Sequence, residues 1–173
     1  MNALILFAGL QPESGSIGDQ LAAIMAALIA VGLVAFYASE RGWFGRLAHL
    51  GMALVAIGLV PMVVGSAAIG WVPSSGESFF IAYLLGLLVA LLGAIVLGIA
   101  MLRSDAAPRA AAWLLIVALP VGLPATIGYT LVTMGVVDHA WVGPELLFGL
   151  AWVVIGYSLW NRRATLGVEE ASR

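Results

Sequence analysis

The chain has 173 residues, of which 63% are hydrophobic and only 9% are charged, and its mean hydropathy is +1.11. This composition excludes an ordinary water-soluble domain and is typical of a protein that lies within a lipid bilayer. The formal charge of -2 is too small to indicate nucleic-acid binding, and the sequence contains neither cysteine nor lysine. Disulfides, thiolate chemistry and lysine-linked cofactors such as retinal are therefore excluded.

The first twenty residues precede the first long apolar run. Met1 to Leu10 are apolar, but they are too few to span a hydrocarbon core of about 30 Å, and they lack the basic start of a signal peptide. The polar residues Gln11 to Ser16 follow at once. We expect residues 1–20 to form an outer-side segment with a short helix lying on the membrane surface.

Five apolar runs are long enough to cross a membrane. They cover residues 20–38, 49–72, 79–102, 111–137 and 146–160. The sequence therefore predicts an all-α fold, an integral membrane bundle of five transmembrane helices within residues 20–161, followed by a tail over residues 162–173.

All arginines lie on one side of this predicted bundle. They follow the first helix, join the third and fourth helices, and follow the fifth helix, at Arg41, Arg46, Arg103, Arg109, Arg162, Arg163 and Arg173. Short arginine-rich loops stay on the cytoplasmic side. We therefore expect a protein of the cell (plasma) membrane. Its N-terminus is expected outside the cell, and its C-terminal tail is expected in the cytoplasm.

The third predicted helix carries a small residue at every fourth position. This ridge consists of Ala82, Gly86, Ala90, Ala94 and Gly98. Small residues let two helix backbones approach closely in a membrane. The ridge therefore predicts close helix packing, either within the chain, between copies of the chain, or with a helix of a partner subunit.

Two hairpins of the bundle share a sequence pattern. Residues 96–103 resemble residues 154–162, and Pro61 precedes the first segment much as Pro120 precedes the second. This pattern indicates that helices two and three form one hairpin and that helices four and five form a second copy of it. Helix one would then lie outside the repeat. The alternative is chance similarity between apolar segments.

The interior of the predicted spans contains no Asp, Glu, Arg or His, since His49 lies at the very start of the second span. Proton relays, ion pathways and intramembrane proteases need such groups at depth, so their absence disfavours pumps and enzymes. We therefore predict a non-enzymatic protein with no catalytic residue and no metal site.

Histidines and outer-side acids are the remaining candidate ligands. His49 begins helix two and His139 follows helix four at the opposite side, so about 30 Å separates them and they cannot hold one iron together. Each can ligate a pigment or metal alone, or be an interfacial side chain. Glu77, Asp138 and Glu145 can join His139 around a divalent metal, or act as ordinary surface charges.

The fourth predicted helix contains Pro120 and Pro124, which remove two backbone donors and should bend it. Hydroxyl groups of Thr126, Tyr129 and Thr130 follow the bend. They are candidate cofactor-binding residues for an apolar ligand with one polar group, such as a quinone, a carotenoid or a lipid. The alternative is that they bond to freed backbone carbonyls or to other helices.

The junction of helices three and four carries a family resemblance. The residues concerned are Leu97 to Arg103, Ala107 to Arg109 and Ala112 to Leu115. This pattern resembles that of many small uncharacterised multi-pass membrane proteins of bacteria and archaea. The resemblance implies a family without an assigned activity, so it carries over no functional residues. The Ala- and Gly-rich, lysine-free composition also suggests a GC-rich prokaryote.

We expect a non-enzymatic accessory or structural subunit of a larger membrane assembly. Its expected partners are membrane lipids and either other membrane subunits or a second copy packed through helix three. The alternative is a binder or carrier of an apolar small molecule between helices two and four, and the third hypothesis is a small transporter. The sequence does not identify a cofactor.

Overall fold

The computed structural model describes residues 17–40, 42, 44–72, 76–104, 108–133 and 142–171. Within these ranges the chain forms six α-helices and no strand, which confirms the all-α prediction. The predicted surface helix before residue 17 lies outside the described residues. From residue 162 to residue 171 only the backbone is described.

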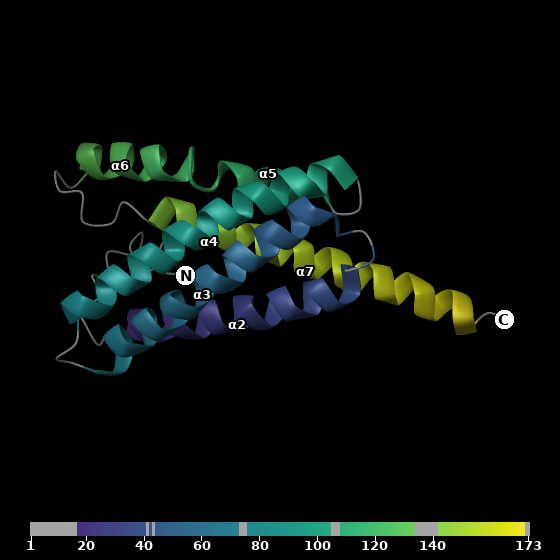
Figure 1. Ribbon diagram of the computed structural model, residues 1–173, viewed down its shortest axis with the longest axis horizontal. Helices are drawn as coiled ribbons and strands as arrows, with labels where there is room; N and C mark the ends of the chain where they lie inside the picture. The colour runs from purple at the N-terminus through teal and green to yellow at the C-terminus, as the bar shows by residue number, and fades with distance from the viewer. Residues whose placement is uncertain are drawn as a thin grey trace.

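The helices run up and down along the long axis of the molecule (Figure 1). Four of them are long and apolar enough to cross a membrane, and α5 with α6 makes a fifth crossing if the bent pair is one span. This agrees with the prediction of a multi-pass bundle. The helices are α2 (Ile17–Glu40), α3 (Arg46–Trp71), α4 (Gly76–Ser104), α5 (Arg109–Val117), α6 (Gly122–Thr133) and α7 (Val142–Ala171).

Apolar side chains cover the outside of the bundle as well as its interior. Val31, Ile57 and Val153 are each more than 60% exposed, as suits helices whose outer faces meet lipid. The interior is apolar too, and it contains small residues such as Ala23, Ala26 and a series of glycines between the larger side chains. Packing in a membrane depends on such small residues, since lipid tails are as apolar as leucine.

The contact between α3 and α4 shows this principle most clearly. Gly51, Gly58 and Gly65 follow one another at seven-residue intervals on α3 and all face α4. A Cβ on Gly51 would lie 2.6 Å from the backbone nitrogen of Leu97. On the other side, a Cβ on Gly93 would lie 2.6 Å from the backbone nitrogen of Val55. The two backbones touch along most of their length.

The small-residue ridge of α4 lies largely inside this same chain. A Cβ on Gly86 would collide with the backbone of Gly58 and Met62, whereas one on Gly98 would meet α5 at the carbonyl of Ala112. Ala90 and Ala94 are completely buried, and Ala82 is half-buried. The helix packs on α3, α5 and α7 at once, so its small face contacts helices of its own chain.

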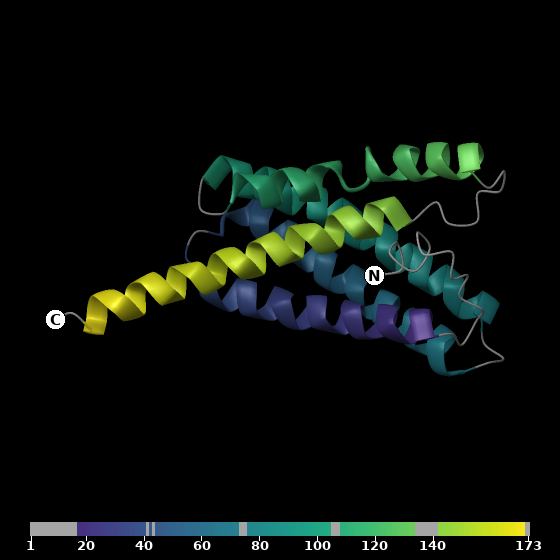
Figure 2. The ribbon, with the colours of Figure 1, turned by 180° about the vertical axis from the view of Figure 1, so that it is seen from behind.

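The span formed by α5 and α6 is bent by 57°. The bend falls between Val117 and Gly122, around Pro120, and Pro124 follows one turn later. Backbone hydrogen bonds of 2.9 Å from Val121 to Val117 and 3.1 Å from Gly122 to Ala118 continue through the bend. Figure 2 shows that α6 runs onward from α5 rather than folding back. The predicted proline bend is confirmed.

The helix α7 is longer than its apolar run. The apolar run covers residues 146–160, and the helix begins at Val142 and ends at Ala171, beyond the rest of the bundle (Figure 2). Pro144 lies in the first turn, where a backbone N–H has no partner within the helix, so the N–H that proline lacks costs no hydrogen bond. The duplicated hairpin stays a prediction, because α3 and α4 touch closely whereas α5 and α6 form a bent span against α7.

Candidate functional site

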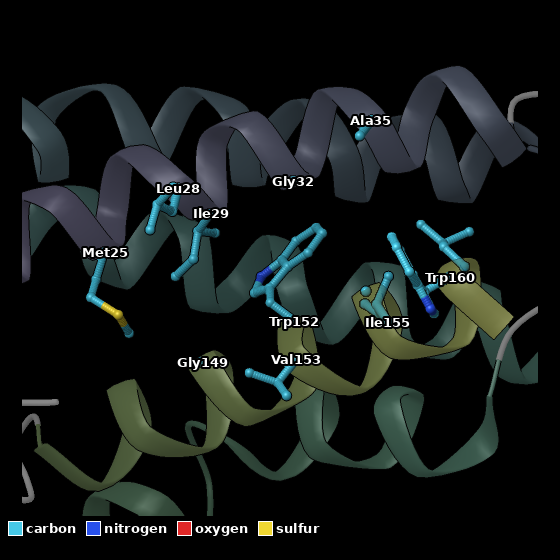
Figure 3. A pocket seen from close by; sticks show the side chains of 12 residues that line it. Met25, Leu28, Ile29, Gly32, Ala35, Gly149, Trp152, Val153, Ile155 and Trp160 are labelled. Atoms are coloured by element: carbon cyan, nitrogen blue, oxygen red, sulfur yellow. The ribbon is translucent and has the colours of Figure 1, made fainter.

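A groove separates α2 from α7. Its volume is about 460 Å³, and it runs beside α7 from Gly149 to Trp160, which is about 16 Å at the rise of an α-helix. Figure 3 shows side chains of both helices around it. Every residue that lines the groove is apolar or glycine: Met25, Leu28, Ile29, Gly32, Ala35, Gly149, Trp152, Val153, Ile155, Gly156, Leu159 and Trp160.

Three glycines keep the groove open. A Cβ on Gly32 of α2, or on Gly149 or Gly156 of α7, would meet no atom within 4 Å. Gly149 and Gly156 have the same seven-residue spacing as the glycines that bind α3 to α4. Here the space beside the backbone holds no neighbouring helix of the described chain.

The groove opens sideways, toward the surroundings of the bundle. Leu28, Val153 and Trp160 line it and are 62%, 67% and 75% exposed. These side chains belong to helices that are long and apolar enough to cross a membrane, so the opening lies on an apolar outer face of the bundle.

Trp152 forms part of the groove wall. Its side chain extends from α7 toward α2 (Figure 3), and only 8% of the residue is exposed. The indole ring packs edge to face with Phe36 of α2 and Phe148 of α7, in both cases with 6.1 Å between ring centroids. These two contacts fix the plane of the indole.

The indole nitrogen of Trp152 has no hydrogen-bond partner among the described residues. A buried donor without an acceptor destabilises a protein by about 1–3 kcal/mol, and most buried donors in native structures are paired. The wall of the groove thus contains, at Trp152, a buried donor without an acceptor among the described residues.

The hydroxyl residues predicted to bind a ligand lie elsewhere, on α6. Thr126 Oγ1 donates to the carbonyl of Gly122 at 3.0 Å and accepts from the backbone N–H of Gly143 at 2.8 Å. It thereby ties α6 to the first turn of α7. Tyr129 is 46% exposed, and the side chain of Thr130 lies outside the described residues.

The helices predicted to enclose that ligand are not neighbours. The span of α5 and α6 packs on α4 and α7, whereas α3 packs on α2 and α4. The third predicted helix, α4, therefore lies between the second and fourth predicted spans. Neither Thr126 nor Tyr129 lines the groove between α2 and α7.

Glu145 corrects the expectation that no acidic side chain enters a span. The residue lies in the first turn of α7, inside the span Gly143–Asn161, and is half-buried. Its Oε1 accepts a hydrogen bond from the Tyr83 hydroxyl of α4. The apolar run begins only at Leu146, but the helix starts four residues earlier and so brings Glu145 against α4.

His49 belongs to an aromatic cluster at the arginine end, where Arg46, Arg103 and Arg109 lie. Its Nδ1 is 3.0 Å from the carbonyl of Gly45, and its ring packs on Phe44 and Tyr37. The described part of the chain contains no group of three His, Asp or Glu that can hold a metal. Asp138 and His139 lie outside the described residues.

Searches of known protein families, of curated proteins and of solved structures found no match for this chain.

Proposed function

We propose that this protein is a non-enzymatic multi-pass protein of a prokaryotic cell membrane, with its N-terminus outside, that binds an apolar molecule between α2 and α7. The open groove beside Gly32, Gly149 and Gly156 carries this proposal. Its volume of about 460 Å³ lies within the range of about 300–1,000 Å³ that is usual for small-molecule sites.

The chemistry of the lining defines the kind of ligand. An apolar wall without a charged group favours a molecule that partitions into the bilayer, such as a lipid, a quinone or a carotenoid. The sideways opening favours entry from the membrane. The lining offers no acid, base or nucleophile, which supports binding or carriage rather than catalysis.

Native mass spectrometry of protein extracted in mild detergent tests the proposal. The Gly149→Leu variant fills the groove with a side chain, and Gly128→Leu is its matched control. A Cβ on Gly128 of α6 also meets nothing within 4 Å, but this residue does not line the groove. We expect the wild type and Gly128→Leu to retain one small molecule in near-integer ratio, and Gly149→Leu to lose it.

Two results would contradict the proposal. One is the same bound mass on all three proteins, which would place the molecule outside the groove. The other is a wild-type protein that carries no small molecule and takes up none when a lipid extract is added.

An accessory subunit of a larger assembly is the second candidate function. The seven-residue spacing of Gly149 and Gly156 favours it, because the same spacing on α3 receives a helix. Since the α4 ridge packs within the chain, a helix from another polypeptide would dock on α7 instead. Copurification of a membrane polypeptide that Gly149→Leu releases, without a small molecule, would favour this candidate. The described residues add no support for a small transporter.

A further inference from the structure

Trp152 lies at the centre of its membrane span. It is the middle residue of the 19-residue span Gly143–Asn161. With a rise of about 1.5 Å per residue, about 14 Å of helix separates it from each end of the span. Its indole N–H therefore lies near the midplane of a hydrocarbon core that is about 30 Å thick.

Few acceptors exist at this depth. Water is absent there, and the ester and headgroup oxygens of glycerolipids lie outside the hydrocarbon core. The carbonyls of an ordinary transmembrane helix are already bonded within that helix. A lipid tail or an apolar partner helix would thus leave the Trp152 donor unpaired.

The space around the indole suits a flat group. Gly149 precedes Trp152 by three residues and Gly156 follows by four, so both flank it on one face of α7. A Cβ on either glycine would meet nothing within 4 Å. In Figure 3 the indole nitrogen is on the side of Gly149 and Met25. Methionine side chains are flexible, so Met25 can move aside for a ligand.

We infer that the ligand carries a ring carbonyl that accepts a hydrogen bond from Trp152 Nε1 at the bilayer midplane, as a prenylated quinone does. The inference rests on the proposed function and names its ligand class. The quinone ring lies in the open space beside Gly149, and its prenyl tail follows the apolar wall past Gly156 to Trp160. That wall extends about 12 Å beyond Trp152 along α7.

Two matched probes test this chemistry on the wild-type protein in nanodiscs. One is a naphthoquinone with a short prenyl tail, and the other is a naphthalene with the same tail and no carbonyl. The readout is the set of indole N–H resonances of the six tryptophans, with Trp152 assigned from the Trp152→Phe spectrum. Trp113→Phe is the control, because Trp113 is exposed on α5 and does not line the groove.

We expect the quinone to bind about tenfold more tightly than the naphthalene, which is the usual size of one added buried hydrogen bond. The Trp152 resonance should shift downfield with the quinone alone. The Trp152→Phe variant should bind both probes equally, while Trp113→Phe should keep the preference for the quinone.

Equal affinity for the two probes, with an unmoved Trp152 resonance and a perturbed Trp160 resonance, would overturn the inference. The groove would then still bind apolar molecules, so the proposed function would stand. If neither probe perturbed any groove resonance, the inference would fail too, and native mass spectrometry of the wild type would decide the proposed function separately. Both of these outcomes are measured on the wild-type protein, so the test remains valid even if the Trp152→Phe variant does not fold.

Discussion

Two helix pairs of this bundle use glycine in opposite ways. On α3, Gly51, Gly58 and Gly65 receive the backbone of α4, and a Cβ at any of them would collide with it. On α7, Gly149 and Gly156 have the same spacing but face open space beside α2. A glycine series therefore marks where another molecule or helix can come close to a helix backbone. It does not identify that neighbour.

The helix α7 is held mainly on the side away from the groove. Tyr83 of α4 donates to Glu145, and Thr126 of α6 accepts from Gly143, so the first turns of α7 are bonded to two neighbours. Toward α2 it makes the apolar contacts of Trp152 with Phe36. The groove can widen or narrow without breaking a described hydrogen bond of α7.

The largest expected effect comes from adding one methyl group to the closed interface. Gly58→Ala should lower the free energy of unfolding by about 3 kcal/mol, because its Cβ overlaps the backbone of Ala90 and Gly86 and forces the helices apart. Gly156→Ala is the matched control and should change it by less than about 1 kcal/mol, since the methyl group meets nothing and alanine favours a helix. Denaturant titration in detergent micelles measures both. If both variants lost the same free energy of unfolding, the contact between α3 and α4 would not differ in packing from the groove between α2 and α7.

A smaller effect is expected at the bond that anchors α7 to α4. Tyr83→Phe should lower the free energy of unfolding by about 2 kcal/mol, because the half-buried carboxyl of Glu145 loses its donor. Tyr157→Phe is the control, since Tyr157 is 67% exposed. The same titration applies. A loss no greater than that of Tyr157→Phe would show that the bond does not hold α7 in place.

The bond between α6 and α7 should contribute less. Thr126→Val removes the acceptor for the Gly143 N–H and should lower the free energy of unfolding by about 1 kcal/mol, while Thr126→Ser keeps a hydroxyl and should stay close to wild type. Thermal unfolding of the three proteins compares them. A stable Thr126→Val and an unstable Thr126→Ser would point to methyl packing instead.

The smallest effect is expected at Trp152 in ligand-free protein. Trp152→Phe loses some packing but also removes an unpaired donor, so the two contributions should cancel to within about 1 kcal/mol. A loss of about 3 kcal/mol would instead mean that the indole N–H has an acceptor within the protein.

The sequence predicts the helices well and their faces poorly. Long apolar runs located the four long apolar helices and the bent pair of α5 and α6, and Pro120 and Pro124 located the bend, because both signals are local. The groove was missed because apolar side chains cover the inner and outer faces alike, so hydropathy does not tell whether Gly149 meets a helix or lipid. Its one available signal was Trp152, since the other five tryptophans lie near predicted span ends.

The contact between Glu145 and α4 was missed for a related reason. The apolar run begins only at Leu146, whereas the helix begins at Val142 and so includes Pro144 and Glu145. Its partner Tyr83 is 62 positions away in the chain, so their contact depends on how α4 and α7 pack. No local pattern in the sequence contains that information.

Photoaffinity labelling tests the central claim most directly. A prenylated quinone with a diazirine in its tail is activated in native membranes, and the labelled residues are mapped by peptide mass spectrometry. Binding in the groove predicts labels on Leu28, Val153 and Trp160, which an excess of unlabelled quinone removes. Labels spread equally over Ile57, Leu92 and other exposed side chains outside the groove, unaffected by the competitor, would contradict it.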